Sequence, residues 1–313
     1  MTAQRMTSMI VLSNTYSRVL LILAGVFLAG CTGLTAQQKD AVTKFGKASS
    51  SLGDTTATEL KAMRQSTMQM NLERLSLSGK DKDMSNAGTP LPGPTNLDSG
   101  FELETVTAVS AATAALSSYG KALVALADDT ESAELRSATD GFATNLALVP
   151  KAQLTDEQRV AIASAANGLG GFVVEAKRKR AVATLVIHAK SSVDKLCTIL
   201  AQDFDPHRGW IAEKLAATSE PLLVAADLAL VNGKNYDQRK AAQEGLRLAF
   251  DNRKRLDLIL SGIQKTAVSM KKANETLAIA IQDGSFSIDD FLDFSEKAQA
   301  LQLAVKSAQP KGD

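Results

Sequence analysis

The chain has 313 residues, of which 45% are hydrophobic and 22% are charged. Such a chain can bury a large core and is not globally disordered. Aromatic residues make up only 4%, which favours helices over strands. The 35 basic and 34 acidic residues leave no positive excess for nucleic-acid binding. Two His and two Cys exclude most zinc, haem and iron–sulfur ligand sets, so the composition predicts neither a cofactor nor a nucleic-acid partner.

The N-terminal residues have the layout of a secretory signal peptide. Residues 19–30 form an uncharged apolar run, which is too short to cross a bilayer because a spanning helix needs about 20 residues. Arg5 and Arg18 precede the run, and small residues close it. A basic segment, an apolar segment and small residues in this order indicate export.

The apolar run ends in Leu28-Ala29-Gly30-Cys31, which resembles the lipobox of bacterial lipoproteins. The resemblance implies cleavage after residue 30 and a diacylated Cys31 as the first mature residue. Two acyl chains, at about 0.8 kcal/mol per buried methylene, would give stable anchoring. Thr32 rather than Asp follows the cysteine, which in Gram-negative lipoproteins implies the outer membrane, here facing the periplasm. The alternatives are an ordinary signal peptide with a chance Cys, or a short buried helix.

The mature chain begins with a predicted membrane-proximal part, residues 31–78, that contains one helix after a short tether. Apolar residues at helical spacing from Phe45 to Leu77 predict a helix to about residue 78, with a break near Gly53 as the alternative because serines and glycine weaken the helix there. Residues 79–100 contain Pro90, Pro92 and Pro94 and predict an exposed loop or linker. The main helical bundle is then expected over residues 101–309.

Within that bundle, apolar stripes predict helices over about 109–126 and 135–146. Thr155 and Gln158 form a capping-box pattern that begins a helical region reaching about residue 200. Three glycines within 168–171 predict a kink or split in that region.

The C-terminal third predicts further helices. Residues 210–231 are apolar, and Ser219-Glu220-Pro221 reads as a fresh helix start. Asp237 is expected to cap the longest helix, to about residue 282, whose apolar residues from 256 to 277 approach heptad spacing. A final helix follows over about 287–305. The predicted fold is all-α: an elongated, antiparallel and partly coiled-coil-like bundle of six to eight helices.

Asp203, Asp205 and His207 are the strongest candidates for a metal site outside the signal peptide. Two carboxylates and an imidazole suit a divalent cation. Three ligands within five residues match no known metal geometry, however, and the Asp205-Pro206 pair is typical of a turn at a helix end. We therefore predict no metal site and keep these three residues as weak candidates.

The remaining chemical motifs have ordinary structural interpretations. Cys197 lies in an apolar helical stretch, which favours a buried thiol over a reactive one. The basic run at residues 177–180 spreads through about 300 degrees of a helix, which favours solvation over contact with anionic lipid. Met63, Met68 and Met70 suit Cu(I), but Met63 and Met70 also fit the apolar stripe.

Three classes of function remain open. The first is a non-catalytic interaction or scaffold protein that binds an envelope protein through its helical surface. The second is a carrier or sensor that holds a lipid or apolar small molecule between helices. The third is an enzyme, which the absence of nucleophile, phosphate-loop and dinucleotide motifs disfavours. The sequence favours the first class and does not fix the oligomeric state.

Overall fold

A computed structural model describes most of the chain after the predicted signal peptide. The described residues are 34–78, 97, 101, 103–128, 132–149, 155–167, 175–283 and 289–308. Within these residues there are eight helices and no strand, so the predicted all-α bundle is confirmed. Cys31 and nearly all of the predicted linker 79–100 lie outside the described residues.

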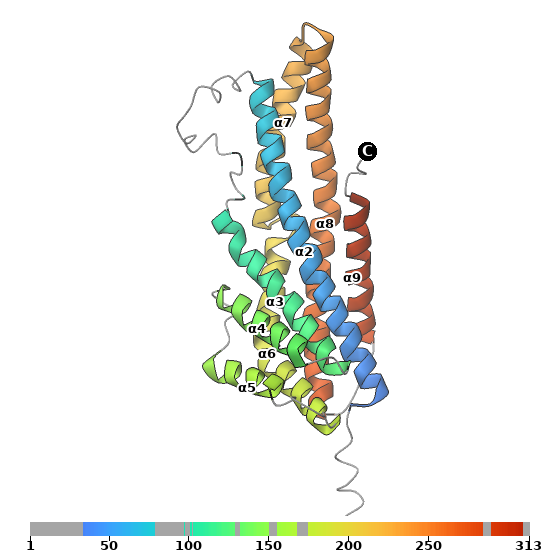
Figure 1. Cartoon of the computed structure of the whole chain (residues 1–313). Coiled ribbons are helices and arrows are strands. Elements are labelled where there is room, and N and C mark those ends of the chain that lie inside the picture. Colours follow the sequence, from blue (N-terminus) through green and yellow to red (C-terminus); the bar gives the residue numbers. More distant parts are fainter. Residues whose placement is uncertain are drawn as a thin grey trace, which may run out of the picture.

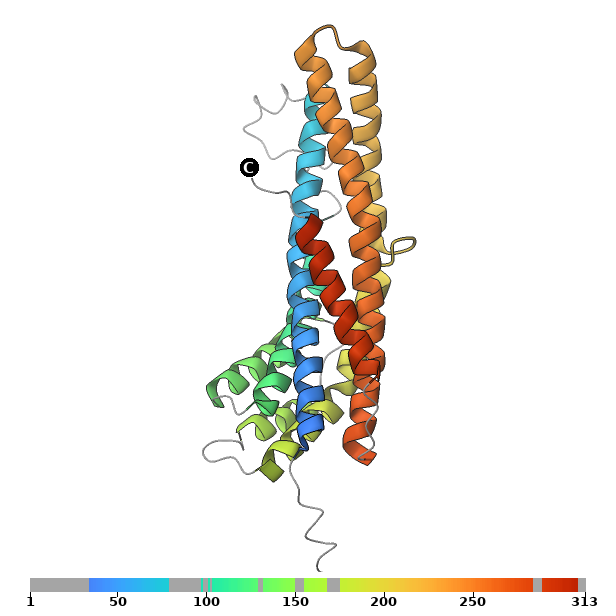
Figure 2. The same ribbon diagram turned by 90° about the vertical axis from the view of Figure 1, so that its right-hand side faces the viewer.

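Two long helices set the axis of the bundle, and shorter helices pack around them (Figure 1). The long helices run in opposite directions, and α6 and α7 follow one another alongside α8 (Figure 2). We call the end at which α2 begins the basal end, and the opposite end the distal end. The helices are α2 Ala36–Leu77, α3 Leu103–Ala127, α4 Ser132–Ala147, α5 Asp156–Asn167, α6 Glu175–Asp203, α7 Trp210–Asn232, α8 Tyr236–Asp283 and α9 Asp289–Ala308.

Helix α2 is continuous, so the alternative of a break near Gly53 is wrong. Thr35 caps the helix: its hydroxyl accepts from the Gln38 backbone N–H at 3.2 Å, and the Gln38 side chain accepts from the Thr35 N–H at 3.0 Å. Gly53 lies within the helix because the α3 backbone passes directly against it. A Cβ atom at Gly53 would lie 2.4 Å from the Thr113 carbonyl oxygen.

The backbones of α2 and α3 come equally close at Gly46, seven residues before Gly53. A Cβ atom at Gly120 would lie 2.3 Å from the Gly46 carbonyl oxygen, and one at Gly46 would lie 2.7 Å from the Gly120 carbonyl oxygen. Glycine is therefore required here for contact between two backbones. Because α2 also packs against α7, α8 and α9, it belongs to the same packed bundle as the helices after residue 100.

Helix α7 passes through Pro221 without stopping, so the predicted fresh helix start at residues 219–221 is wrong. A proline in a helix interior removes one backbone hydrogen bond and crowds the preceding turn. Pro221 lies on the exposed side of α7, while Leu215 and Leu222 are buried on either side of it along the chain. Packing of the buried side thus holds the helix together across the proline.

Helix α8 begins two residues earlier than predicted. The cap is Asn235, whose side-chain oxygen accepts from the Gln238 N–H at 2.9 Å, and Asp237 lies inside the first turn. At 1.5 Å per residue, the 48 residues of α8 extend about 72 Å. The capping box predicted at Thr155 and Gln158 is confirmed, with side-chain to backbone distances of 2.9 and 3.2 Å.

The basal half contains the large core. Phe45 of α2 lies at its centre, with ring centroids 6.3 Å from Tyr119 and 6.0 Å from Phe291 in edge-to-face geometry. The apolar stripes predicted for α3, α4, α6 and α9 are all buried. Edge-to-face aromatic pairs add stabilisation beyond the burial of their area, so the Phe45 ring contributes to this core through both its burial and its ring contacts.

A polar network crosses the basal core. The Tyr119 hydroxyl donates to Asn274 at 3.0 Å, and the Asn274 amide donates to Asp194 at 3.1 Å. Lys190 completes the network with a 2.7 Å salt bridge to Asp194. Because every member has a partner, the network fixes the relative register of α3, α6 and α8.

Candidate functional site

The Asp203, Asp205 and His207 segment forms the joint between α6 and α7. Asp205 accepts from the backbone N–H groups of His207 and Arg208 at 2.8 and 3.0 Å, and from Gln264 of α8 at 2.9 Å. The hydrogen bond from the His207 backbone is the main cause that lowers the Asp205 pKa. Asp205 is thus a turn residue that ties the joint to α8.

Asp203 and His207, the other two candidates, do not join Asp205 in a ligand set. Burial raises the Asp203 pKa, although a hydrogen bond from Trp210 partly offsets this. The His207 side chain is exposed. No group of three or more His, Cys, Asp or Glu side chains capable of holding a metal occurs among the described residues. Asp203 therefore ends α6, Asp205 and His207 lie in the connection that follows, and no ligand set assembles from them.

The cysteine, methionine and basic motifs are placed as follows. Cys197 is free and fully buried, and burial raises the pKa of its thiol, so the thiol stays protonated. Met63 and Met70 are buried in the predicted stripe. In the basic run, Arg178 is buried while Lys177 and Arg180 are exposed, so the run does not form one patch. Cys31 lies outside the described residues, and its lipidation stays a prediction.

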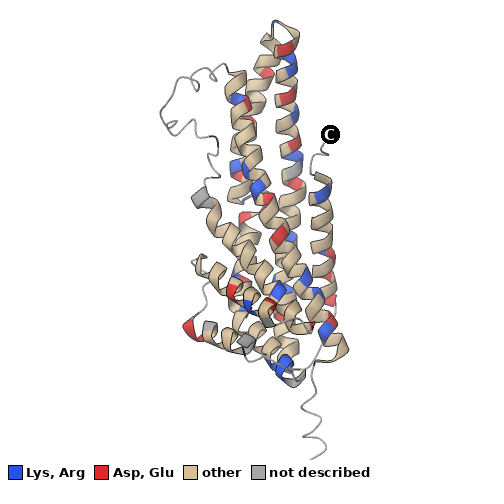
Figure 3. Ribbon diagram, viewed as in Figure 1, with Lys and Arg blue, Asp and Glu red and all other residues tan. Residues whose placement is uncertain are grey.

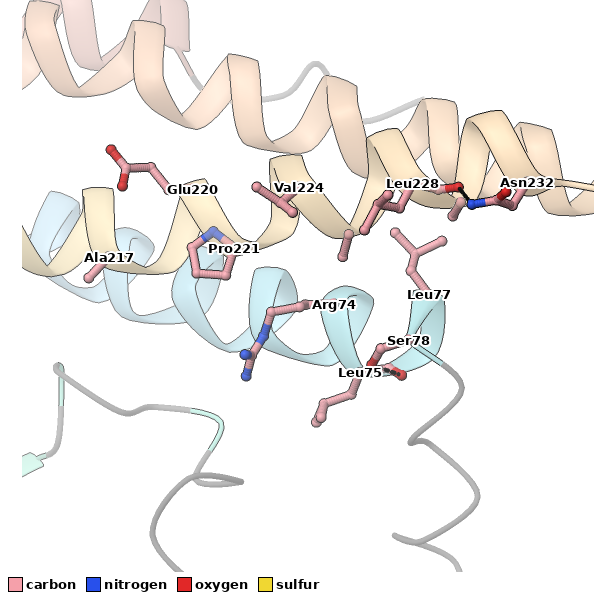
Figure 4. A pocket seen from close by; sticks show the side chains of 12 residues that line it. Arg74, Leu75, Leu77, Ser78, Ala217, Glu220, Pro221, Val224, Leu228 and Asn232 are labelled. Atoms are coloured by element: carbon pink, nitrogen blue, oxygen red, sulfur yellow. Dashed lines mark hydrogen bonds between the residues drawn. The ribbon is translucent and has the colours of Figure 1, made fainter.

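A groove lies at the distal end, between the end of α2 and residues 217–232 of α7 (Figure 4). Its volume is about 960 Å³. The α7 wall includes Pro221, Val224 and Leu228, and Leu77 of α2 points toward Leu228 across the groove. The full lining comprises Arg74, Leu75, Leu77, Ser78, Ala217, Glu220, Pro221, Val224, Ala225, Leu228, Ala229 and Asn232.

Helix α7 has two apolar faces, and only one is covered. The covered face packs on α2 and α8 through Ile211, Leu215, Leu222 and Ala226. The open face is an apolar seam that consists of Ala217, Pro221, Val224, Leu228 and Val231, all exposed to solvent. Val224, Leu228 and Val231 are 61%, 57% and 76% exposed. Side chains of this size are normally buried, and exposed apolar patches mark sites of interaction.

The core beneath the groove is small. Its fully buried members are Met70, Leu222 and Ala249, with Leu77, Leu223 and Leu248 packed partly against them. We call this region the distal arm: residues 70–77 of α2, residues 217–232 of α7 and residues 236–252 of α8. A 3.2 Å hydrogen bond from Ser66 to Asn252 joins α2 and α8 at the basal boundary of the arm.

Two described helices are long and apolar enough to cross a membrane by length and composition: the α3 stretch Val106–Ala127 and all of α7, Trp210–Asn232. In α3, 67% of the most apolar stretch is buried in the bundle, as expected for a core helix. In α7 the buried share is only 28%. The difference again singles out α7 as a helix with an uncovered apolar face.

Sequence reasoning missed this seam although its signal is present. The five seam residues follow one another at intervals of four, three, four and three, which is heptad spacing. The sequence predicts residues 210–231 only as an apolar segment, without assigning Leu222 and Leu228 to different faces; Leu222 is buried and Leu228 is exposed. Periodicity alone does not say which of two apolar faces of one helix is covered.

The comparisons with known proteins add no assignment. The chain matches no family model, and no curated protein or solved structure is significantly similar to it. Any function must therefore be argued from the residues and their geometry.

Proposed function

We propose that the protein is a membrane-anchored envelope lipoprotein that acts as a non-catalytic interaction or scaffold protein. The observation that supports this proposal best is the open apolar seam of α7 in the distal arm. A surface of this kind loses free energy when another apolar surface covers it, at roughly 25 cal/mol per Å². The lipid anchor is proposed from the Leu28-Ala29-Gly30-Cys31 motif.

The placement of the two features suits such a role. Leu34, where the described chain begins, lies three residues after Cys31 and next to the start of α2. The groove lies at the other end of α2, and the 42 residues of this helix extend about 63 Å. A chain anchored at Cys31 would thus present its seam well away from its point of attachment.

The anchor is tested by Cys31→Ala in the full chain. We expect the variant to leave the membrane fraction, because the variant has no thiol to acylate, whereas wild-type protein stays there after a salt wash. Membrane retention equal to wild type would contradict the anchor.

The interaction role is tested by a photo-activatable cross-linking residue placed at Leu228 in living cells. The matched control is the same residue at Leu303, which is similarly exposed on α9 at the surface of the bundle. We expect a discrete cross-linked protein at 228 and none at 303, and its loss with Cys31→Ala. Identical products at both positions would contradict a specific surface.

The second candidate function is a carrier or sensor for a lipid or apolar molecule. The observation in its favour is the volume of the groove, about 960 Å³, which is in the range of small-molecule sites. Native mass spectrometry of the protein released from membranes distinguishes the two roles. A stoichiometric lipid that Leu228→Gln removes would favour the carrier.

A further inference from the structure

We propose that the seam of α7 is one half of a coiled-coil contact, and that its occupant is an amphipathic helix of a partner protein with basic residues beside its apolar stripe. This inference rests on the proposed interaction role and names the chemistry of the partner. It follows from the spacing of the seam and from the charges beside it.

The spacing fixes the shape of the occupant. Residues at intervals of four and three occupy the a and d positions of a heptad, the positions that a facing helix covers in a coiled coil. The seam extends from residue 217 to residue 231, or about 21 Å of helix. A straight helix with apolar residues at the same intervals matches this stripe along its whole length.

The charges beside the seam fix the chemistry of the occupant. Glu213, Glu220 and Asp227 recur every seven residues and therefore occupy the g position, next to the seam. All three are exposed, and none forms a salt bridge within the described part of the chain. Charges at e and g positions select the partner in coiled coils, so this acidic row favours Lys or Arg on the facing helix.

The row also argues against a second copy of this chain as an antiparallel partner. Antiparallel pairing would set the acidic rows of the two copies against each other, and like charges in this position are destabilising. Parallel pairing would set the row against Thr218, Ala225 and Asn232, which carry no charge. Neither arrangement offers the row a basic partner, whereas a basic helix does.

Two polar groups of the groove lining have incomplete hydrogen bonding, and only one of them is placed where a docked helix can act. Pro221 has no N–H, so the Ala217 carbonyl in the groove lining loses its usual helical donor. On the α2 side of the groove, the buried Nε of Arg74 has no hydrogen-bond partner among the described residues. A side-chain donor on the docked helix would satisfy the Ala217 carbonyl, whereas the Arg74 Nε is enclosed by the protein itself.

The test uses the mature chain, residues 31–313, with Cys31→Ser so that it carries no lipid. The probes are two labelled synthetic helices of 21 residues with Leu at every a and d position. One carries Lys at every e and g position, and the other carries Glu. We expect the Lys probe to bind at least tenfold more tightly than the Glu probe at physiological salt, as measured by fluorescence anisotropy.

Two variants assign that preference to the seam. The double variant Glu220→Lys/Asp227→Lys is expected to weaken the Lys probe about tenfold and to strengthen the Glu probe. Leu228→Asp is expected to weaken both probes. The matched control Leu303→Asp, on exposed α9, is expected to change neither, and circular dichroism with thermal unfolding shows that each variant is folded.

Several results would overturn the proposal. Equal affinity for the two probes, or an unchanged preference in the charge-reversed variant, would contradict a basic helix. A dimer in sedimentation velocity that Leu228→Asp dissociates would make a second copy the occupant. Binding to phosphatidylcholine vesicles that Leu228→Asp abolishes would make a membrane the occupant. Failure of the probes together with specific cross-linking at residue 228 would reject this partner chemistry and leave the interaction role supported.

Discussion

The basal half and the distal arm of this bundle use the same two long helices in different ways. In the basal half, α2 and α8 are surrounded by α3, α6 and α9, and their apolar faces are covered. In the distal arm they have only α7 and each other, and α7 keeps five seam residues in solvent. The chain thus buries its core completely at the basal end and leaves an apolar surface of α7 uncovered at the distal end.

Charge does not explain the difference between the two regions. Lys, Arg, Asp and Glu are intermingled along α2 and α8 in both of them (Figure 3). What differs is the number of helices available for packing. The comparison can be tested by substitutions that should lower the free energy of unfolding strongly in the basal half and hardly at all in the seam.

The largest effect is expected for Phe45→Ala in the basal core. The Phe45 side chain is fully buried and touches aromatic rings from α3 and α9. Its removal is expected to lower the free energy of unfolding by about 3–5 kcal/mol. Urea denaturation followed by circular dichroism measures this loss, and a loss near zero would show that the basal core is not packed as described.

The second-largest loss in the free energy of unfolding is expected for Gly120→Ala. The added methyl group would lie 2.3 Å from the Gly46 carbonyl oxygen and 2.5 Å from the Ser50 nitrogen, so α2 and α3 must separate. Overpacking of this kind costs about 1–3 kcal/mol. The control is Gly141→Ala, where the nearest atom is the Ser118 hydroxyl at 3.0 Å, which can rotate away. Equal stability of the two variants would contradict the backbone contact.

An intermediate effect is expected for Tyr119→Phe. The variant leaves Asn274 without its donor, at a cost of about 1–3 kcal/mol. Burial raises the pKa of Tyr119 above its ordinary value of 10.0, so the folded state keeps the phenol protonated where the unfolded state ionises it. Wild-type stability should therefore fall as the pH rises above about 10, and Tyr119→Phe should reduce that fall. Identical alkaline profiles would contradict the burial of this phenol.

The smallest effect is expected for Leu228→Gln in the seam. Because the side chain is 57% exposed, its replacement should change the free energy of unfolding by no more than about 0.5 kcal/mol. The same denaturation experiment measures it. A loss as large as that of Phe45→Ala would show that the seam is covered in the isolated protein, which would remove the contrast between the two regions.

Much of the fold was predictable from local patterns. The stripe from Val109 to Leu126 and the stripe from Phe291 to Val305 are buried as predicted. The capping box at Thr155 also formed as expected. These features depend on residues within a few turns of one another, where periodicity and capping chemistry act directly.

The errors have a common physical cause. Gly53 and Pro221 are signals for helix termination, and both lie inside continuous helices. Gly53 is held by the α3 backbone, and α7 is held across Pro221 by its buried face. Tertiary packing overrides local propensity in both cases, and a sequence pattern does not contain the position of the neighbouring helix.

The sequence by itself determined that the chain is helical, where most helices lie and which residues form their apolar stripes, because these properties follow from composition and local spacing. It also supplied the lipobox prediction, which depends on four consecutive residues. The sequence also favoured a turn at Asp205-Pro206, and the tertiary structure decided that Gln264 of α8 ties Asp205 to the bundle. The tertiary structure also decided which face of α7 is covered and which is open, because burial depends on which helices are near enough to cover each face.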